Sequence, residues 1–507
     1  MKICLYSPYG LLLQLFETEL DIAQGYLDKG YEVEIITCNS FIPACELNPE
    51  KKIDYCLNCI SRSRNGLKLL TGKVKQINLM SFLSKENIDF CNELKFQIRS
   101  IDDLKKLEVL GFNIGSCVYS SLIDYAKNPF PILRDYNDVL TRFSKTSLFN
   151  FFCFENYLKT NKPNKVVLFN GRHALTKPII YLSKKRGIDF DTYEYSNFFD
   201  RYNIYKNTQP HDFRYRHRIL ENMWKESAEN IDSKVDKAKQ FFDINRNKNG
   251  KTAFFHTSHQ IHGTLPENFN KSKHNVVIFT SSEFESYAAF DYSENGVYQS
   301  QYSGICEIIN SLQKVNTNLH IYIKLHPYLK SIDESSNEIT QYDNFKEDFL
   351  TMIYPTSKVD TYTLIDNCDK VVSFLSTTSV EAAYMNKPSI ILSKHLFSLM
   401  NFAYKPQSHS EVISLLLNPH LEPISNIDVF KYGYFMMKYG KKYKYYQPFR
   451  REVGVFKRKV IKPHLFISKI EGYLLKRNFI SIKLVMEKLY IIILNLFFFR
   501  KFSIKII

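Results

Sequence analysis

Two short polar stretches in the C-terminal half of the chain carry residue types that could bind a phosphate. Lys324 and His326 stand at the end of one apolar, β-branched run, and a hydroxyl run, Ser376 to Ser379, follows another. Ammonium, imidazolium and hydroxyl groups all donate hydrogen bonds to the oxygens of an anion. The two stretches therefore predict an anion site, although the hydroxyls alone could also serve only to cap a following helix.

The elements around the hydroxyl run indicate how it would be positioned. Residues 371–375 and 389–392 are predicted strands, and residues 377–385 between them contain good helix formers. A strand, a tight turn and a helix in this order aim the free N–H groups of the helix N-terminus at a crevice. Ligands bind at the carboxyl ends of strands in open α/β sheets, so we expect the polar residues at neighbouring strand ends to converge there: Ser281, Ser282, Lys324, His326 and Ser376 to Ser379.

The length and the order of the predicted elements indicate two domains and a tail. A chain of 507 residues exceeds one ordinary core. Residues 2–37 read as a parallel α/β unit without the G-x-G-x-x-G of a dinucleotide dehydrogenase, and a second α/β series follows a polar, turn-rich segment at Asp243 to Thr252. The predicted fold class is α/β, with two Rossmann-like domains that face an interdomain cleft (residues 1–245 and 250–430) and a basic helical C-terminal tail (residues 431–507) that partly returns to the N-terminal domain.

The net charge of +16 is concentrated in the tail. Residues 431–507 hold 19 lysines and arginines and three acids, so residues 1–430 are neutral overall. Apolar segments such as Leu489 to Phe499 interrupt these charges, a pattern that suits an anionic membrane surface better than nucleic acid. The alternative is a terminal helix packed into a core, with a solvated basic rim.

The start of the chain and its apolar runs predict a location. The first residues, MKICLYSPYG, lack the long apolar core and the cleavage site of a secretory signal. No apolar run approaches the roughly 20 residues of a membrane-spanning helix. We therefore expect a cytoplasmic protein that is peripheral on the inner face of the cytoplasmic membrane.

Four of the ten cysteines cluster after the second predicted strand: Cys38, Cys45, Cys56 and Cys59. Disulfides are not expected in a cytoplasmic chain. Four thiols close together have the ligand count of a structural zinc site, although the spacing C-x6-C-x10-C-x2-C is not that of a standard finger. We predict a structural zinc ion here; the alternative is that Cys38, which closes a strand, belongs to the core.

Residues 275–395 resemble a known family. The stretch KLHP (Lys324 to Pro327), followed some fifty residues later by STTSVEAAYMNKPSI, resembles the donor half of bacterial surface-polysaccharide glycosyltransferases, especially the capsule polysaccharide biosynthesis group. That group includes Kdo transferases that use CMP-Kdo, and the HP and Ser/Thr motifs also resemble those of bacterial sialyltransferases. The resemblance implies a GT-B type fold and a nucleotide-sugar donor held by the C-terminal domain.

The resemblance also implies roles for single residues. In that group the His of the HP motif and the Ser/Thr turn hold the nucleotide phosphate, which corresponds here to His326, Ser376 and Thr377, and Glu381 matches a position that supports the nucleotide. No D-x-D stands where a metal-dependent enzyme holds its cation, so no catalytic metal is expected, and the absent D-E-D-G of one sialyltransferase group disfavours a sialyl donor. The predicted donor-binding residues are Ser281, Ser282, Lys324, His326, Pro327, Ser376, Thr377, Thr378 and Glu381.

Sugar transfer needs a base for the acceptor hydroxyl and a stabiliser for the departing phosphate. His326 as imidazolium, Lys324 and the helix N-terminus behind Ser376 would stabilise the phosphate. Glu17 and Glu19 begin the first N-terminal helix and either could be the base, although acids in a first turn can simply complement the helix dipole. The predicted acceptor-binding residues stand at the ends of N-domain strands: Asn170, Arg172 and Glu194. The alternative is that they are surface polar residues that only close these strands.

Three classes of function fit these features. The first is a retaining or inverting glycosyltransferase of capsule or lipopolysaccharide assembly, acting on a saccharide or lipid-linked acceptor. The second is a sugar-nucleotide epimerase on the same fold, and the third is a non-catalytic, membrane-associated binding protein of polysaccharide export. The basic, apolar tail favours the first class, because lipid-linked acceptors lie at the membrane.

Overall fold

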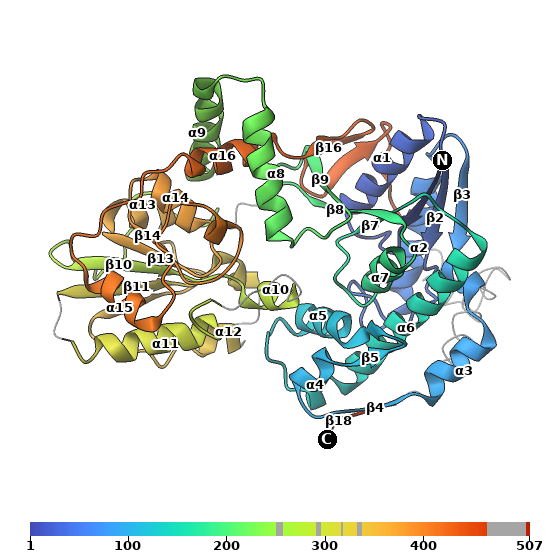
Figure 1. The fold of residues 1–507 in the computed structure, drawn as a ribbon, viewed down its shortest axis with the longest axis horizontal. Coiled ribbons are helices and arrows are strands. Elements are labelled where there is room, and N and C mark those ends of the chain that lie inside the picture. The colour runs from blue at the N-terminus through green and yellow to red at the C-terminus, as the bar shows by residue number, and fades with distance from the viewer. Residues whose placement is uncertain (250–256, 290–295, 316–317, 332–336, 464–502, 507) are drawn as a thin grey trace, which may run out of the picture. The chain divides into compact units, whose positions relative to one another are not determined.

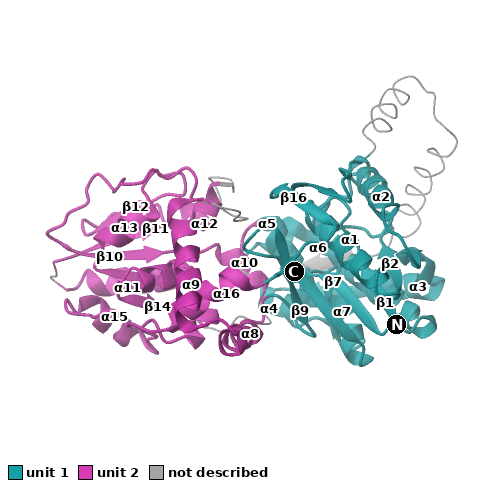
Figure 2. Ribbon diagram, turned by 90° about the horizontal axis from the view of Figure 1, so that it is seen from above, with its two compact units in different colours: residues 1–126, 130–210, 440–507 teal, residues 127–129, 211–439 magenta. Residues whose placement is uncertain are grey.

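The computed structural model describes residues 1–249, 257–289, 296–315, 318–331, 337–463 and 503–506. Two compact units make up the chain (Figure 2). Unit 1 comprises residues 1–126, 130–210 and 440–507, and unit 2 comprises residues 127–129 and 211–439. Unit 1 is therefore assembled from both ends of the sequence.

Unit 1 is built on a seven-stranded sheet of order β15-β9-β8-β7-β1-β2-β3 (Figure 1). The five strands from β8 to β3 in this order are parallel, and β9 and β15 extend the sheet antiparallel. The apolar residues of β1, β2, β7 and β8 are buried on both faces, as a covered parallel sheet requires. The strands are β1 (Lys2–Tyr6), β2 (Glu32–Thr37), β3 (Val74–Asn78), β7 (Lys165–Phe169), β8 (Asp189–Tyr195), β9 (Arg201–Lys206) and β15 (Lys441–Lys442).

Helices cover this sheet, and the long buried helix α6 is the largest of them. Side chains of β1, β2 and α1 form one continuous core cluster, which also takes in Tyr446 and Phe456 from the C-terminal end of the unit. The helices are α1 (Leu15–Leu27), α2 (Ile53–Leu67), α3 (Lys85–Glu93), α4 (Ile101–Lys105), α5 (Ile114–Ala126), α6 (Asn137–Thr160) and α7 (Lys177–Lys185), with short strands β4 (Lys95–Ile98), β5 (Glu108–Val109) and β6 (Phe112–Asn113).

Unit 2 is built on a five-stranded, all-parallel sheet of order β12-β11-β10-β13-β14. Its core joins residues of the central strands to α11 and α15. The elements are α8 (Phe213–Glu226), α9 (Ile231–Asn247), β10 (His274–Phe279), α10 (Glu283–Ala288), α11 (Gln301–Leu312), β11 (Leu319–Lys324), α12 (Asn337–Thr340), β12 (Leu350–Ile353), α13 (Thr361–Asn367), β13 (Lys370–Ser373), α14 (Thr378–Tyr384), β14 (Ser389–Ile391), α15 (His409–Leu417) and α16 (Asp428–Lys438).

The α/β class with two Rossmann-like sheets, predicted from the sequence, is confirmed. The segment predicted as a turn-rich linker begins differently, because Asp243 to Asn247 form the last turns of α9. That helix is capped by Asn230 and anchored by the buried Phe241 and Phe242, so packing outweighs the polar character of its end. Both α8 and α9 belong to unit 2 by their contacts.

Residues 440–463, here called the C-terminal strap, run along unit 1 beside α1 (the orange-red segment near β16 in Figure 1). The carboxylate of Asp21 accepts three consecutive backbone N–H groups of residues 444–446, and Arg62 donates to the carbonyl of Ile461. A hairpin of β16 (Tyr446–Arg450) and β17 (Val453–Phe456) follows β15. The strap thus consists of strands and turns where a helical tail was predicted, because its alternating aromatic and β-branched residues favour extended chain.

The remainder of the predicted tail lies mostly outside the described residues. This includes Leu489 to Phe499, the segment expected at the membrane surface. The described residues resume with β18 (Ser503–Ile506), which pairs in parallel with β4. In the described part of the chain, no helix combines the length and apolar character that crossing a bilayer demands.

Candidate functional site

Three strand ends of unit 2 lie side by side. In the sheet register, Phe279 at the end of β10 pairs with Lys324 of β11 and with Ser373 of β13. The loops that follow also contact one another, since the backbone N–H of His326 donates to Thr280 Oγ1 at 3.0 Å. The structure therefore brings together the loops that carry most of the predicted donor-binding residues.

The hydroxyl run is partly engaged within its own turn. Thr378 donates to Ser376 Oγ from its backbone N–H (3.3 Å) and its hydroxyl (2.9 Å), and the Ser379 hydroxyl donates to the carbonyl of Ser376. Thr377 is exposed and makes no side-chain cap to α14. The run therefore shapes the turn after β13 and presents Thr377 outward.

Other members of the predicted set also have partners. The backbone N–H and hydroxyl of Ser281 approach Gln301 Oε1 at 2.8 and 3.2 Å, whereas the buried hydroxyl of Ser282 has no hydrogen-bond partner. His326 Nδ1 accepts from the backbone N–H of Tyr328. Pro327 begins the short 3-10 helix Pro327–Ser331.

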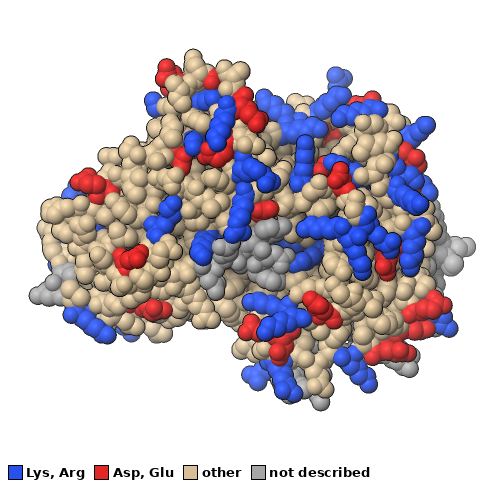
Figure 3. Space-filling model, in the orientation of Figure 1, with Lys and Arg blue, Asp and Glu red and all other residues tan. Residues whose placement is uncertain are grey.

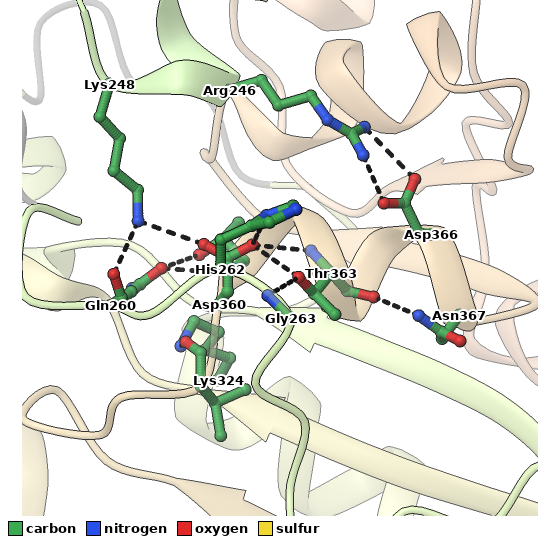
Figure 4. A network of polar contacts seen from close by, with 12 residues as sticks. Arg246, Lys248, Gln260, His262, Gly263, Lys324, Asp360, Thr363, Asp366 and Asn367 are labelled. Carbon is green, nitrogen blue, oxygen red and sulfur yellow. Dashed lines mark hydrogen bonds and ion pairs between the residues drawn. The ribbon is translucent and has the colours of Figure 1, made fainter.

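The lysine of the KLHP stretch is buried away from the loops. Lys324 Nζ donates to the carbonyl of Val359 at 2.9 Å, and burial lowers its pKa to about 8. Figure 4 shows this side chain beneath a polar network centred on Asp360. Because this buried ammonium group is already hydrogen-bonded, it holds the segment of Val359 in place and is not directed at a ligand in the loops.

Asp360 ties the segment after α9 to α13. Its carboxylate accepts from the N–H and hydroxyl of Thr363, each at 2.9 Å, and from Lys248 Nζ at 3.2 Å (Figure 4). Burial acts to raise the pKa of this carboxyl, but these bonds outweigh it and hold the pKa below its ordinary value. The sequence holds a signal for this contact, because an Asp three residues before Thr363 is typical of a helix N-cap, but Asp360 was not among the predicted site residues.

Glu381 lies inside unit 2. Tyr362 donates to its carboxylate at 3.2 Å and Asn245 at 3.3 Å, so the side chain is held by α13 and α9. Burial raises the pKa of this carboxyl to about 7. If Glu381 supports the nucleotide as predicted, it does so indirectly, by holding α13 and α9 in place.

In unit 1 the two predicted base residues are both buried. Glu17 forms an ion pair with Arg62, whose guanidinium also donates to the carbonyl of Gly10 at 2.6 Å. Glu19 accepts hydrogen bonds from the hydroxyls of Ser7 and Tyr193. Burial raises the pKa of Glu17, and it raises that of Glu19 to about 8.

The predicted acceptor residues occupy the ends of β7 and β8. Asn170 donates to Glu194 at 2.7 Å, and burial raises the pKa of that glutamate. Arg172 forms an ion pair with Asp124 of α5, and His173 Nε2 lies 2.7 Å from the same carboxylate oxygen. Asp124 and His173 were not predicted from the sequence, because only the folded chain brings α5 to the end of β7.

The four clustered cysteines line one cavity at the carboxyl ends of β1 and β2, with an empty volume of about 510 Å³ that includes open solvent. All four are free thiols, and burial raises the pKa of Cys38, Cys45 and Cys59. Within the described part of the chain, no group of three or more His, Cys, Asp or Glu side chains is arranged to hold a metal ion. The zinc site stays a prediction.

Comparison with known proteins bears on unit 2 above all. A family model described as capsule polysaccharide biosynthesis protein matches residues 197–411, which include all three strand-end loops. The family resemblance predicted from the sequence is confirmed over these residues. No curated protein matches the chain.

Solved structures give distant likenesses. The KpsC β-Kdo 2,4 transferase of Thermosulfurimonas dismutans is 11% identical (TM-score 0.35; 53% of this chain and 78% of that one covered), and its 2,7 counterpart is 13% identical (0.33; 62% and 88%). The UDP-GlcNAc 2-epimerase of Methanocaldococcus jannaschii is 14% identical (0.29; 85% and 98%). TM-scores of this size carry no argument about fold or function.

Proposed function

We propose that this protein is a glycosyltransferase of capsule or lipopolysaccharide biosynthesis. It transfers a sugar from a nucleotide-activated donor to a saccharide or lipid-linked acceptor. The observation that carries the proposal is the match of the capsule polysaccharide biosynthesis family to residues 197–411, because this range contains the adjoining loops after β10, β11 and β13. CMP-Kdo is the donor that we propose first, on the resemblance of the KLHP and STTS motifs.

Unit 2 would hold the nucleotide at these loops. His326 stands at the start of a loop whose backbone is fixed by Thr280, and Thr377 is the exposed hydroxyl of the neighbouring turn. Hydrogen-bond donors that are fixed in place before the reaction stabilise the negative charge that develops on a departing phosphate. No step of this scheme uses a metal ion.

Unit 1 would hold the acceptor, and Glu19 is the better placed of the two base candidates. Glu17 is neutralised by Arg62, whereas Glu19 is linked through the Ser7 hydroxyl to the carboxyl end of β1. Ser7 lines the cysteine-lined cavity. Glu19 can act as a base only in its deprotonated form, and because burial raises its pKa to about 8, that form predominates only above about pH 8.

The deciding experiment incubates the protein with CMP-Kdo and with other CMP-, UDP-, GDP- and CDP-sugars, with and without a short saccharide acceptor. We expect acceptor-dependent release of nucleotide from one donor, with the sugar recovered on the acceptor. Isomerisation of a sugar without any acceptor would establish the epimerase instead. A protein that binds glycan but changes no donor would be the export component.

The structural zinc ion remains part of the proposal, supported by the four thiols that share one cavity. A tetrathiolate site would fasten the loop after β2 to α2, and it would need these side chains to close around the ion. Elemental analysis of protein purified without added metal should give about one zinc per chain. If the protein is purified without zinc and its thermal stability does not change when zinc is added, the four cysteines are ordinary thiols.

The membrane contact is proposed through the C-terminal strap and the residues after it. The strap carries exposed basic residues together with exposed apolar ones such as Phe449 and Val460. On the face drawn in Figure 3, Lys and Arg side chains gather over unit 1, whereas much of the unit 2 surface is uncharged. Basic and apolar residues that are exposed together suit the surface of an anionic bilayer.

A further inference from the structure

Arg216 stands on the inward face of α8. It lies three residues after Phe213 and four before Leu220, so the three side chains share one side of the helix. Phe213 and Leu220 are buried in a core cluster of unit 2 that includes Leu396 and Phe397, next to the end of β14. The guanidinium is therefore directed at the body of the unit, whereas Arg218 on the same helix is exposed.

The guanidinium of Arg216 has no anionic partner in the part of the chain that the structure describes. Its Nε is buried without a hydrogen-bond acceptor. The titratable groups on which its charge acts are His395, before the 3-10 helix Leu396–Leu399, and Tyr432 of α16, and neither is a carboxylate. An arginine that is partly buried and unpaired costs free energy unless a ligand supplies the missing oxygens.

His395 adds a second donor beside Arg216. Its Nδ1 accepts from the backbone N–H of Phe397, so the ring proton belongs on Nε2, which is buried and lacks a hydrogen-bond partner. Burial, helped by the nearby charge of Arg216, lowers the pKa of this imidazole to about 4, although hydrogen bonding to the backbone of Phe374 opposes the shift. The ring is therefore a neutral donor at physiological pH.

The position of this pair identifies the ligand. Phe374, which lies against His395, comes two residues before Ser376 in the loop after β13. A planar guanidinium suits two oxygens of one phosphate. We propose that Arg216 and the Nε2–H of His395 bind the phosphate of the nucleotide donor at the carboxyl ends of β13 and β14. This inference rests on the proposed function and names a phosphate-binding arginine outside the predicted set.

Calorimetry with nucleotides and their nucleosides tests the proposal. We expect the wild-type protein to bind CMP more tightly than cytidine, or the equivalent pair for whichever base the donor panel identifies. Arg216→Ala should weaken nucleotide binding by about 10- to 100-fold, the scale for losing a charge-assisted bond, and leave nucleoside binding unchanged. The matched control is Arg218→Ala, which removes the same charge from the exposed face of α8 and should bind CMP as the wild type does.

The remaining outcomes are equally decisive. If Arg216→Ala binds CMP as tightly as the wild type while sugar transfer persists, Arg216 has no role in the phosphate site and the proposed function stands. If the wild type binds no nucleotide of the panel, both the inference and the proposed function are wrong. If the protein binds inorganic phosphate but not CMP, and Arg216→Ala weakens that binding, then Arg216 and His395 bind a free anion and the nucleotide assignment is wrong. Arg216→Lys, which keeps the charge but not the fork, should recover part of the affinity and guards against misfolding of the alanine variant.

Discussion

The carboxyl ends of the two sheets differ in how their charges are satisfied. In unit 1 two arginines beside predicted site residues are paired with acids, Arg62 with Glu17 and Arg172 with Asp124. In unit 2 Arg216 has no acid among the described residues, and Ser282 keeps a buried hydroxyl without a partner. Two charges that are paired satisfy each other, whereas a buried donor without a partner can be satisfied by a bound anion. The proposed phosphate site of unit 2 requires such an unpaired cation, and the proposed acceptor site of unit 1 does not.

The largest expected effect comes from breaking the buried pair of unit 1. Arg62→Met should lower the free energy of unfolding by about 3–5 kcal/mol, because it leaves the Glu17 carboxylate buried and unpaired. It also removes the bonds to Gly10 and Ile461. Urea denaturation measures the loss, and adding Glu17→Gln to the same chain should restore part of it. Equal stabilities of the single and double variants would show that the ion pair does not matter.

The next effect tests the donor side. His326→Ala should lower turnover by about 10²-fold, the scale for losing one group that stabilises a developing charge. Steady-state kinetics with saturating donor measure this value, and the thermal midpoint of the variant controls for misfolding. Turnover equal to that of the wild type would remove His326 from the site.

Glu381 offers a pH-dependent effect of similar size. Its pKa in the folded protein, about 7, exceeds the ordinary value of 4.5, so the folded state binds the proton more tightly. The stability contributed by the protonated carboxyl is therefore complete below pH 4.5 and is lost as pH rises to about 7, by an amount on the order of 3 kcal/mol. Glu381→Gln should abolish this fall in urea denaturation between pH 5 and 8. A parallel pH profile in both proteins would contradict the assignment.

The smallest effect concerns the surfaces of the two units. Replacing the exposed Arg458 and Lys459 of the strap by Gln should weaken binding to anionic vesicles by about 1 kcal/mol for each charge removed. Added salt should weaken the binding of the wild type and of the variant. Lys314 and Lys346, exposed on unit 2, are the matched control pair. Vesicle sedimentation measures the difference. Equal losses from both pairs would mean that net charge alone, and not the strap, drives the attachment.

The sequence predicted the scaffold of the site better than its chemistry. The strand ends at Phe279, Lys324 and Ser373 follow from apolar, β-branched runs that close in polar residues, and these are local signals. The direction of Lys324, which points to the carbonyl of Val359, depends on a segment 35 residues away. No local pattern reports such a contact.

Partners from distant segments explain the other differences. Glu17 reads as an ordinary first-turn acid until α2 brings Arg62 to it, and Arg216 reads as one of several arginines in a basic helix start until Phe213 and Leu220 fix its face. The end of α9 was predicted as a linker because polar residues dominate it, whereas contacts with α16 hold it in the helix. In each case tertiary packing overrides or completes a local preference.

The C-terminal strap has a consequence for how the protein is made. Asp21 can bind the N–H groups of residues 444–446 only after these residues have left the ribosome, whereas nearly all of unit 2 is one continuous stretch, residues 211–439. Unit 1 must therefore wait, incomplete, while those residues are synthesised, which takes roughly 10–45 s at about 5–20 residues per second. During this interval the surface of α1 that the strap covers is open to chaperones, and the second unit of the chain can finish folding before the first.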